Sequence, residues 1–167
     1  MNKVYIFDVD GTLTPSRQKM TADFEEFFYE WSKGKKYYLV SGSDLPKMRE
    51  QMGYLYLDRA QGLFTCGGNK FYVKDKLEYD RKFDPPITLL KYLKEILINS
   101  KYRLRTGNHI EDRGSMLNFS VIGRDCNLNQ RKHYFEWDNK HKEREKIAKY
   151  INERWNYLQA VIGGQIS

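Results

Sequence analysis

Short apolar runs alternate with amphipathic segments over the first third of the chain. The run "KVYIFDV" (3–9) is nearly all apolar, which predicts a buried parallel strand. In "TADFEEFFYEWSKG" (21–34) the aromatic residues recur at helical spacing and predict an amphipathic helix. The next segments predict a second strand, "KKYYLVSGSD" (35–44), and a short helix, "SDLPKMREQMG" (43–53). The order strand, helix, strand, helix favours an α/β unit with a parallel sheet.

The pattern changes from about residue 63 onward. "LFTCGGNKFYVKDKLEYDRKF" predicts a third strand followed by a hairpin, and "ITLLKYLKEILINS" carries a helical stripe of apolar residues. "SMLNFSVIG" predicts a strand, the charged segment after it a helix through Ile147, Ile151 and Trp155, and "YLQAVIGGQIS" a final strand. We therefore expect two domains, an α/β domain at 1–82 and an α+β module at 83–167.

Composition and charge narrow the class of protein. The 167 residues are 40% hydrophobic and 31% charged, which is typical of a globular chain. No apolar run approaches the roughly 18 to 20 residues that cross a bilayer, so we expect no membrane partner and a cytoplasmic location. Cys66 and Cys126 follow no metal-ligand spacing and are interpreted as buried small hydrophobic residues.

The net charge of +7 fits nucleic acid, a membrane surface or a phosphorylated small substrate. Much of the basic excess lies in "QRKHYFEWDNKHKEREKIAK", where acids interleave with bases as on a solvated helix face. This distribution disfavours nucleic acid as a partner.

Two aspartates, Asp8 and Asp10, follow the first predicted strand one residue apart. Reactive groups collect at the carboxyl ends of strands in a parallel α/β sheet, and Gly11 allows the tight turn through which a phosphate can approach the backbone. Two neighbouring carboxylates repel each other unless a cation lies between them, and Mg²⁺ prefers such oxygen ligands. One carboxylate could then attack phosphorus while the other transfers the proton of a hydroxyl group.

The whole segment "FDVDGTLT" resembles motif I of the haloacid dehalogenase superfamily. The resemblance implies a Rossmannoid α/β core with a cap domain, Asp8 as the nucleophile and Asp10 as the general acid and base. The same resemblance implies Mg²⁺ bound by Asp8 and Asp10, with the backbone carbonyl of Asp10 as a further ligand. It also implies a hydroxyl residue at the end of the second strand that hydrogen-bonds the phosphoryl group. Both Ser41 and Ser43 of "LVSGSD" fit that role; Ser41 occupies the more usual position, and Ser43 could instead cap the next helix.

Four segments narrow the resemblance to the eukaryotic phosphomannomutase family: "FDVDGTLTPSRQKM", "SGSDLPKMREQMG", "IEDRGSMLNFSVIGRDC" and "IGGQIS". In that family, arginines of the cap hold the distal phosphate of a hexose bisphosphate. The residues that match these and other substrate contacts are Arg17, Arg113, Arg124, Arg131 and Ser167. Converging guanidinium groups suit phosphate oxygens, whereas a neutral sugar would not need them.

The function implied is that of a Mg²⁺-dependent phosphohexomutase. Such an enzyme moves a phosphoryl group between C1 and C6 of a hexose phosphate through an aspartyl-phosphate. The expected partners are mannose or glucose 1- or 6-phosphate, a bisphosphate activator, and a second copy in a homodimer through the cap. The alternatives are a phosphatase of a small phosphorylated metabolite, a phosphosugar-binding relative impaired in catalysis, and a noncatalytic binder of anions or nucleic acid.

The sequence also departs from the family pattern. The family's motif III lysine and motif IV acids follow the segment that matches "GGQIS", so the core is expected to be incomplete at its C-terminal side. The chain could be part of a longer product, a short form completed by a second chain, or a degenerate relative. Within the matched region, "VIGR" lacks a usual proline, "EDRGS" differs around Arg113, and Ile162 replaces a frequent basic residue.

Overall fold

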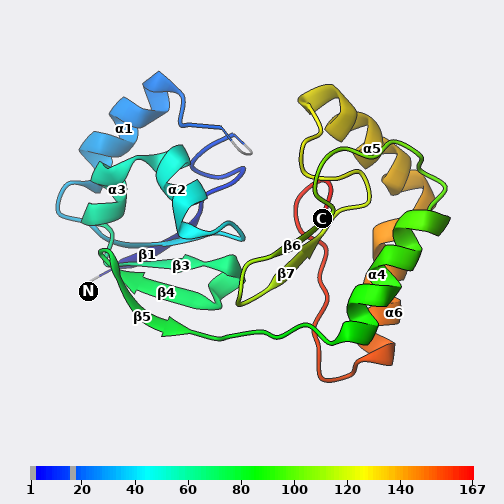
Figure 1. Cartoon of the computed structure of the whole chain (residues 1–167). Coiled ribbons are helices and arrows are strands. Elements are labelled where there is room, and N and C mark those ends of the chain that lie inside the picture. The colour runs from blue at the N-terminus through cyan, green and yellow to red at the C-terminus, as the bar shows by residue number, and fades with distance from the viewer. Residues whose placement is uncertain (1–2, 16–17) are drawn as a thin grey trace. The chain divides into compact units, whose positions relative to one another are not determined.

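The computed structural model describes residues 3–15 and 18–167, so Arg17 lies outside the described residues. The chain divides into two compact units (Figure 1). The first comprises Met1–Phe83 with Arg113–Met116, and the second comprises Asp84–Asp112 with Leu117–Ser167.

A five-stranded sheet in the order β1-β2-β3-β4-β5 forms the first unit. The first three strands are parallel, and an antiparallel hairpin of β4 and β5 extends the sheet. Asp8 pairs with Val40, and Val40 pairs with Phe64, so the carboxyl ends of the parallel strands meet at one end of the sheet. The strands are β1 (Val4–Asp8), β2 (Lys36–Val40), β3 (Gly62–Thr65), β4 (Lys70–Val73) and β5 (Lys76–Asp80).

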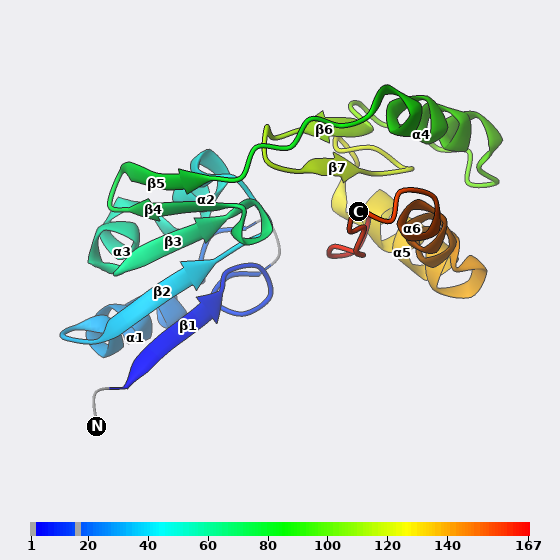
Figure 2. The ribbon, with the colours of Figure 1, turned by 90° about the horizontal axis from the view of Figure 1, so that it is seen from below.

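Three helices cover one face of this sheet: α1 (Ala22–Ser32), α2 (Leu45–Met52) and α3 (Tyr54–Arg59) (Figure 2). The core between helices and sheet includes the fully buried Phe28, Tyr37, Leu39 and Met48. Alternate side chains along a strand point to opposite faces, which explains why Tyr37 and Leu39 both reach this core.

The prediction that β1 is a buried strand was wrong. The strand pairs with β2 and forms one edge of the sheet in the part of the chain that the structure describes. Tyr5 and Phe7 pack against the core, but Val4 and Ile6 on the opposite face are 56% and 66% exposed. Its apolar run therefore has one buried face rather than two.

The second unit packs three helices with a two-stranded antiparallel hairpin. Its core contains Tyr102, Val121, Ile122, Tyr134 and Ile166. The elements are α4 (Ile87–Asn99), β6 (Ile110–Asp112), β7 (Leu117–Phe119), α5 (Leu128–His141) and α6 (Glu143–Arg154).

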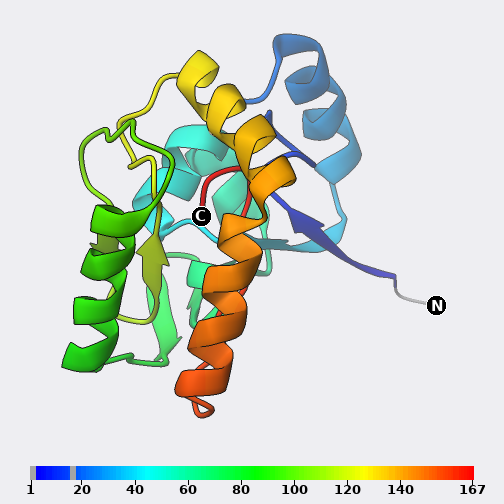
Figure 3. The same cartoon turned by 90° about the vertical axis from the view of Figure 1, so that its right-hand side faces the viewer.

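Two predictions for this unit were wrong. The charged segment forms two helices rather than one, because the backbone turns at Lys142, whose φ of 56° lies in the left-handed region (Figure 3). Residues 157–167, expected to form a final strand, form turns and irregular structure instead. Gly163 and Ser167 exchange backbone hydrogen bonds of 3.0 and 3.2 Å, which close a tight loop.

Candidate active site

The loop after β1 folds around the carbonyl oxygen of Val9. This oxygen accepts hydrogen bonds from the backbone amides of Leu13 and Thr14, both at 3.0 Å, and the Gly11 amide donates to the Thr14 carbonyl at 2.7 Å. Gly11 has a φ of 79°, a conformation that favours glycine. The loop thus returns on itself within six residues (9–14), with Asp10 half-buried at its start.

The electrostatic environment of Asp8 favours its neutral form. Desolvation raises the pKa of the Asp8 carboxyl above its ordinary value, and the negative charge of Asp10 raises it further. The Val9 amide, which donates to Asp8 Oδ1 at 2.9 Å, opposes this shift. A cation at the pair, or a bound phosphate with its cation, would therefore relieve an existing electrostatic cost.

The loop after β2 carries the two candidate serines. Ser41 is buried, and its Oγ accepts a hydrogen bond from the Ser43 amide at 3.0 Å. The amides of Cys66 and Gly67 at the end of β3 donate to the carbonyls of Ser43 and Ser41 at 2.8 and 3.0 Å. Ser43 is half-buried, so of the two residues it is the more exposed.

Helix α2 begins directly after this loop. The Asp44 carboxylate accepts from the Lys47 amide at 3.0 Å and caps the helix, as the sequence predicted for Ser43 or Asp44. The buried side chain of Gln51, near the other end of the helix, donates to Asp10 Oδ1 at 2.9 Å. Gln51 was not predicted as a site residue from the sequence; the signal there is a single amide side chain between Met48 and Met52 on the apolar face of the helix.

The donor set at this end of the sheet suits a hard cation with few protein ligands. Among residues 3–15 and 18–167, no group of three or more His, Cys, Asp or Glu side chains could hold a metal ion. Mg²⁺ is usually bound by one or two carboxylates together with waters and substrate phosphates, so Asp8 and Asp10 fit it.

Among the described residues, the structure brings the predicted substrate contacts Arg124 and Ser167 together. In the second unit, Arg124 Nη1 donates to Ser167 Oγ at 3.2 Å, and Arg124 Nε lies 3.5 Å from Glu111 Oε2. Arg131 lies buried in the first turns of α5. Arg113 groups with the first unit, where its Nη1 donates to the carbonyl of Gly42 at 2.6 Å, within the loop that carries Ser41 and Ser43.

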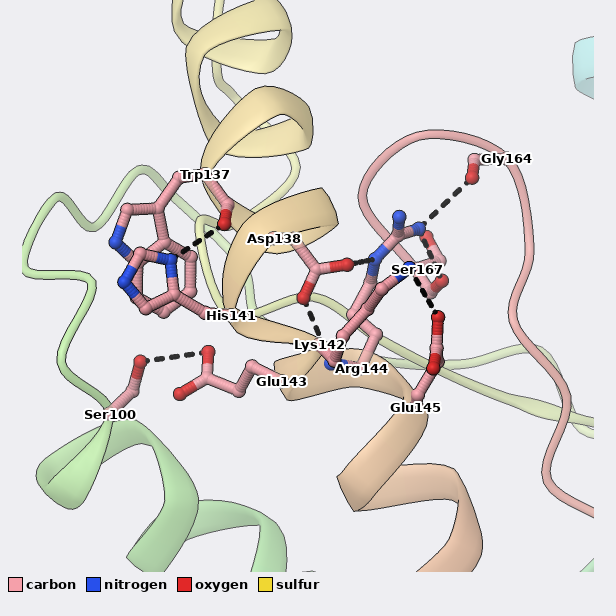
Figure 4. Close-up of polar contacts among 10 residues, drawn as sticks. All are labelled: Ser100, Trp137, Asp138, His141, Lys142, Glu143, Arg144, Glu145, Gly164 and Ser167. Atoms are coloured by element: carbon pink, nitrogen blue, oxygen red, sulfur yellow. Dashed lines mark hydrogen bonds and ion pairs between the residues drawn. The ribbon is translucent and has the colours of Figure 1, made fainter.

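A buried ion pair holds the loop that carries Ser167 (Figure 4). Arg144 Nε donates to Asp138 Oδ2 at 2.7 Å, and the Arg144 amide donates to Asp138 Oδ1 at 3.0 Å. The Arg144 Nη1 donates to the carbonyls of Gly164 and Ser167 at 3.0 and 3.2 Å. The turn at Lys142 makes this possible, because it directs the start of α6 back towards Asp138.

Comparisons with known proteins agree with this architecture. A family model described as eukaryotic phosphomannomutase matches residues 24–167. A probable phosphomannomutase of Caenorhabditis elegans is 34% identical over 98% of this chain and 69% of its own length. A phosphomannomutase of Galdieria sulphuraria is 36% identical over 97% of this chain and 68% of its own length.

A solved structure shares the fold at low sequence identity. The N-terminally truncated, IMP-bound IMP-nucleotidase of Plasmodium falciparum superposes with a TM-score of 0.52 over 98% of this chain and 50% of its own, at 12% identity. The predicted α/β fold class is thereby confirmed. The sequence matches confirm the predicted class of enzyme, a phosphomannomutase-like phosphotransferase. The chain belongs to the eukaryotic phosphomannomutase family.

Proposed function

We propose that this protein is a phosphohexomutase that moves a phosphoryl group between C1 and C6 of mannose or glucose phosphates. The observation that carries the proposal is the position of Asp8 and Asp10 at the carboxyl end of β1, in a chain of the phosphomannomutase family. Parallel pairing of β1 with β2 places the Ser41–Ser43 loop after the neighbouring strand end.

Asp8 acts as the nucleophile in this mechanism. Its carboxylate attacks phosphorus of a hexose bisphosphate, the bond between phosphorus and the sugar oxygen breaks, and that oxygen takes a proton from Asp10. In the other half-reaction the free hydroxyl of a bound hexose monophosphate attacks phosphorus of the aspartyl-phosphate and gives its proton to Asp10. The bond from phosphorus to Asp8 then breaks, which restores the carboxylate and forms a hexose bisphosphate; return of its other phosphate to Asp8 leaves the isomeric monophosphate.

The other residues of the site bind and orient the transferring group. Phosphoryl transfer depends mainly on alignment and on neutralisation of charge, which the Ser43 hydroxyl and the backbone beside Gly11 supply in part. Asp8 and Asp10 would hold Mg²⁺, which supplies positive charge to the phosphoryl oxygens when it is bound.

Arg124 and Ser167 are proposed to bind the phosphate that does not react. Their contact in the second unit gives a cation and a hydroxyl donor next to each other, which suits phosphate oxygens. Arg113, Arg131 and Arg17 are proposed to contribute to the same function. A site for a second phosphate favours a mutase over a phosphatase, because a monophosphate phosphatase has no second phosphate to bind.

The proposal predicts that the chain converts mannose 1-phosphate to mannose 6-phosphate when glucose 1,6-bisphosphate and Mg²⁺ are present. Asp8→Asn should abolish this conversion because it removes the nucleophile. Asp58→Asn, an exposed substitution on α3, is the matched control and should leave the rate unchanged. The conversion is measured with a coupled assay for mannose 6-phosphate, alongside release of inorganic phosphate.

Three results would count against the proposal. Undiminished conversion by Asp8→Asn would refute the role of Asp8. Phosphate release without isomerisation would identify a phosphatase. Absence of both from the native chain, with the bisphosphate still bound, would identify a phosphosugar-binding protein.

A further inference from the structure

A buried amide side chain contacts the proposed acid and base. Gln51 is 3% exposed, and its Nε2 lies 2.9 Å from Asp10 Oδ1, 3.2 Å from Thr14 Oγ1 and 3.5 Å from the carbonyl oxygen of Gln18. Thr14, itself buried, donates to the Val9 carbonyl at 3.3 Å. The Gln51 side chain on α2 thereby contacts Asp10 and Thr14, which lie near the two ends of the loop 9–14.

The surroundings decide which end of the amide faces Asp10. An amide nitrogen donates, whereas an amide oxygen accepts. The flipped amide would put its oxygen against a carboxylate and a carbonyl oxygen, neither of which can donate. Gln51 is therefore a donor to Asp10, and this contact offsets part of the cost of burying the amide, whose Oε1 is buried without a hydrogen-bond partner among the residues that the structure describes.

We propose that Gln51 is a positioning residue that fixes the orientation of the Asp10 carboxylate for proton transfer. The inference rests on the function proposed above, in which Asp10 exchanges a proton with the sugar oxygen. Helix α2 gives Gln51 a rigid base, because Asp44 caps the helix and Leu45 and Met48 bury its inner face. Helix α2, which follows the loop that carries Ser41 and Ser43, thus also sets the orientation of Asp10.

The two chemical roles of the aspartates make the inference testable. Attack by Asp8 needs no proton transfer, but departure of a sugar oxygen does, because an alkoxide is a poor leaving group. A p-nitrophenolate leaves with its electron pair and needs no proton. Loss of Gln51 should therefore impair reaction with mannose 1-phosphate and spare reaction with p-nitrophenyl phosphate.

The experiment compares kcat/KM of the full chain for these two substrates. The mannose 1-phosphate reaction, run with glucose 1,6-bisphosphate and Mg²⁺, includes both proton transfers by Asp10, at the attacking hydroxyl and at the departing sugar oxygen. For p-nitrophenyl phosphate, kcat/KM covers only the steps up to departure of p-nitrophenolate, which need no proton. Gln51→Met preserves the length of the side chain and removes its donors. For this variant we expect kcat/KM for mannose 1-phosphate to fall about tenfold or more, with KM little changed. The value for p-nitrophenyl phosphate should stay within about twofold, because general acid catalysis is not used there.

Two comparisons separate positioning from a structural role. Gln51→Glu, which has the same shape but presents an anion to Asp10, should impair mannose 1-phosphate turnover at least as much as Gln51→Met. Gln61→Met, an exposed substitution, should change neither value. Thermal unfolding midpoints of all the variants are measured in parallel.

A parallel fall of kcat/KM for both substrates, or no fall for either, would overturn the inference and leave the proposed function standing. A native chain that transfers phosphate from neither substrate would refute the proposed function, and the role of Gln51 with it. A loss selective for mannose 1-phosphate supports both.

Discussion

At the scale of single residues, the account depends on two carboxylates with different surroundings. Asp8 accepts a hydrogen bond from the Val9 amide, and desolvation and the charge of Asp10 raise its pKa. Asp10 accepts a hydrogen bond from the buried Gln51 side chain. One carboxylate is thus presented at the strand end, and the other is oriented by a buried partner, which matches a division between nucleophile and proton carrier.

The raised pKa of Asp8 predicts a stability change in Asp8→Asn. A carboxyl whose pKa is higher in the folded than in the unfolded state destabilises the fold increasingly as pH rises above the unfolded-state pKa, and fully once pH exceeds the folded-state pKa. At pH ~7 the variant should unfold at a higher temperature than the native chain, because it lacks the desolvated charge. The difference should disappear as pH falls below about 4, where the carboxyl is protonated in both states.

Thermal unfolding followed by circular dichroism across this pH range measures the effect. A variant less stable than the native chain at neutral pH would contradict the environment described for Asp8, as would a gain in unfolding temperature that persists in acid.

Added Mg²⁺ should raise the unfolding temperature of the native chain more than that of Asp8→Asn, because it neutralises the charge that the variant lacks.

At the scale of elements, the sequence predicted those whose side chains repeat over several turns or are bounded by strong local signals. Helix α1 follows from the helical spacing of its aromatic residues, and α2 from Asp44 and Gly53 at its ends. Strand β6 is three residues long, too short for a periodic pattern, and was not predicted. The break at Lys142 was missed because lysine gives no signal of a left-handed backbone.

The wrong final strand has a comparable cause. Val161 and Ile162 suggested a strand, but they are 72% and 44% exposed, and Ile166 alone of these three apolar residues enters the core.

The contact of Gln51 with Asp10 could not be predicted from the sequence, because it joins positions 41 residues apart through the packing of α2. By contrast, Cys66 and Cys126 are buried, as predicted.

The ion pair between α5 and α6 predicts a large loss of stability in Arg144→Met. The side chains of Asp138 and Arg144 are 5% and 9% exposed, so the variant leaves a buried carboxylate without its cation. Removing one partner of a buried pair costs about 3–5 kcal/mol. The loop that carries Ser167 should also loosen, since Arg144 donates to two of its carbonyls.

The control for this prediction lies on the same helix. Lys149 and Glu153 form a pair at 3.8 Å whose side chains are 77% and 63% exposed, and such pairs contribute little. Lys149→Met should therefore change the unfolding free energy by less than about 1 kcal/mol. Urea unfolding measures the unfolding free energy of both variants. Equal losses in Arg144→Met and Lys149→Met would contradict a larger contribution of the buried Asp138–Arg144 pair.

At the scale of the whole molecule, the chain combines two compact units that carry different parts of the proposed chemistry. The first holds Asp8, Asp10 and the serine loop, and the second holds Arg124 and Ser167. The boundary proposed from the sequence, a core at 1–82 and a cap at 83–167, and the homodimer through the cap stay predictions. In the described part of the chain, no helix has the length and apolar character needed to span a membrane.

The most direct test of the central claim is to trap the phosphorylated enzyme. The native chain is mixed with glucose 1,6-bisphosphate and Mg²⁺, quenched in acid, and digested for mass spectrometry. The account predicts one added phosphoryl group on Asp8, sensitive to hydroxylamine as an acyl phosphate is, and absent from Asp8→Asn. A phosphoryl group on another residue, or one that persists in Asp8→Asn, would contradict it.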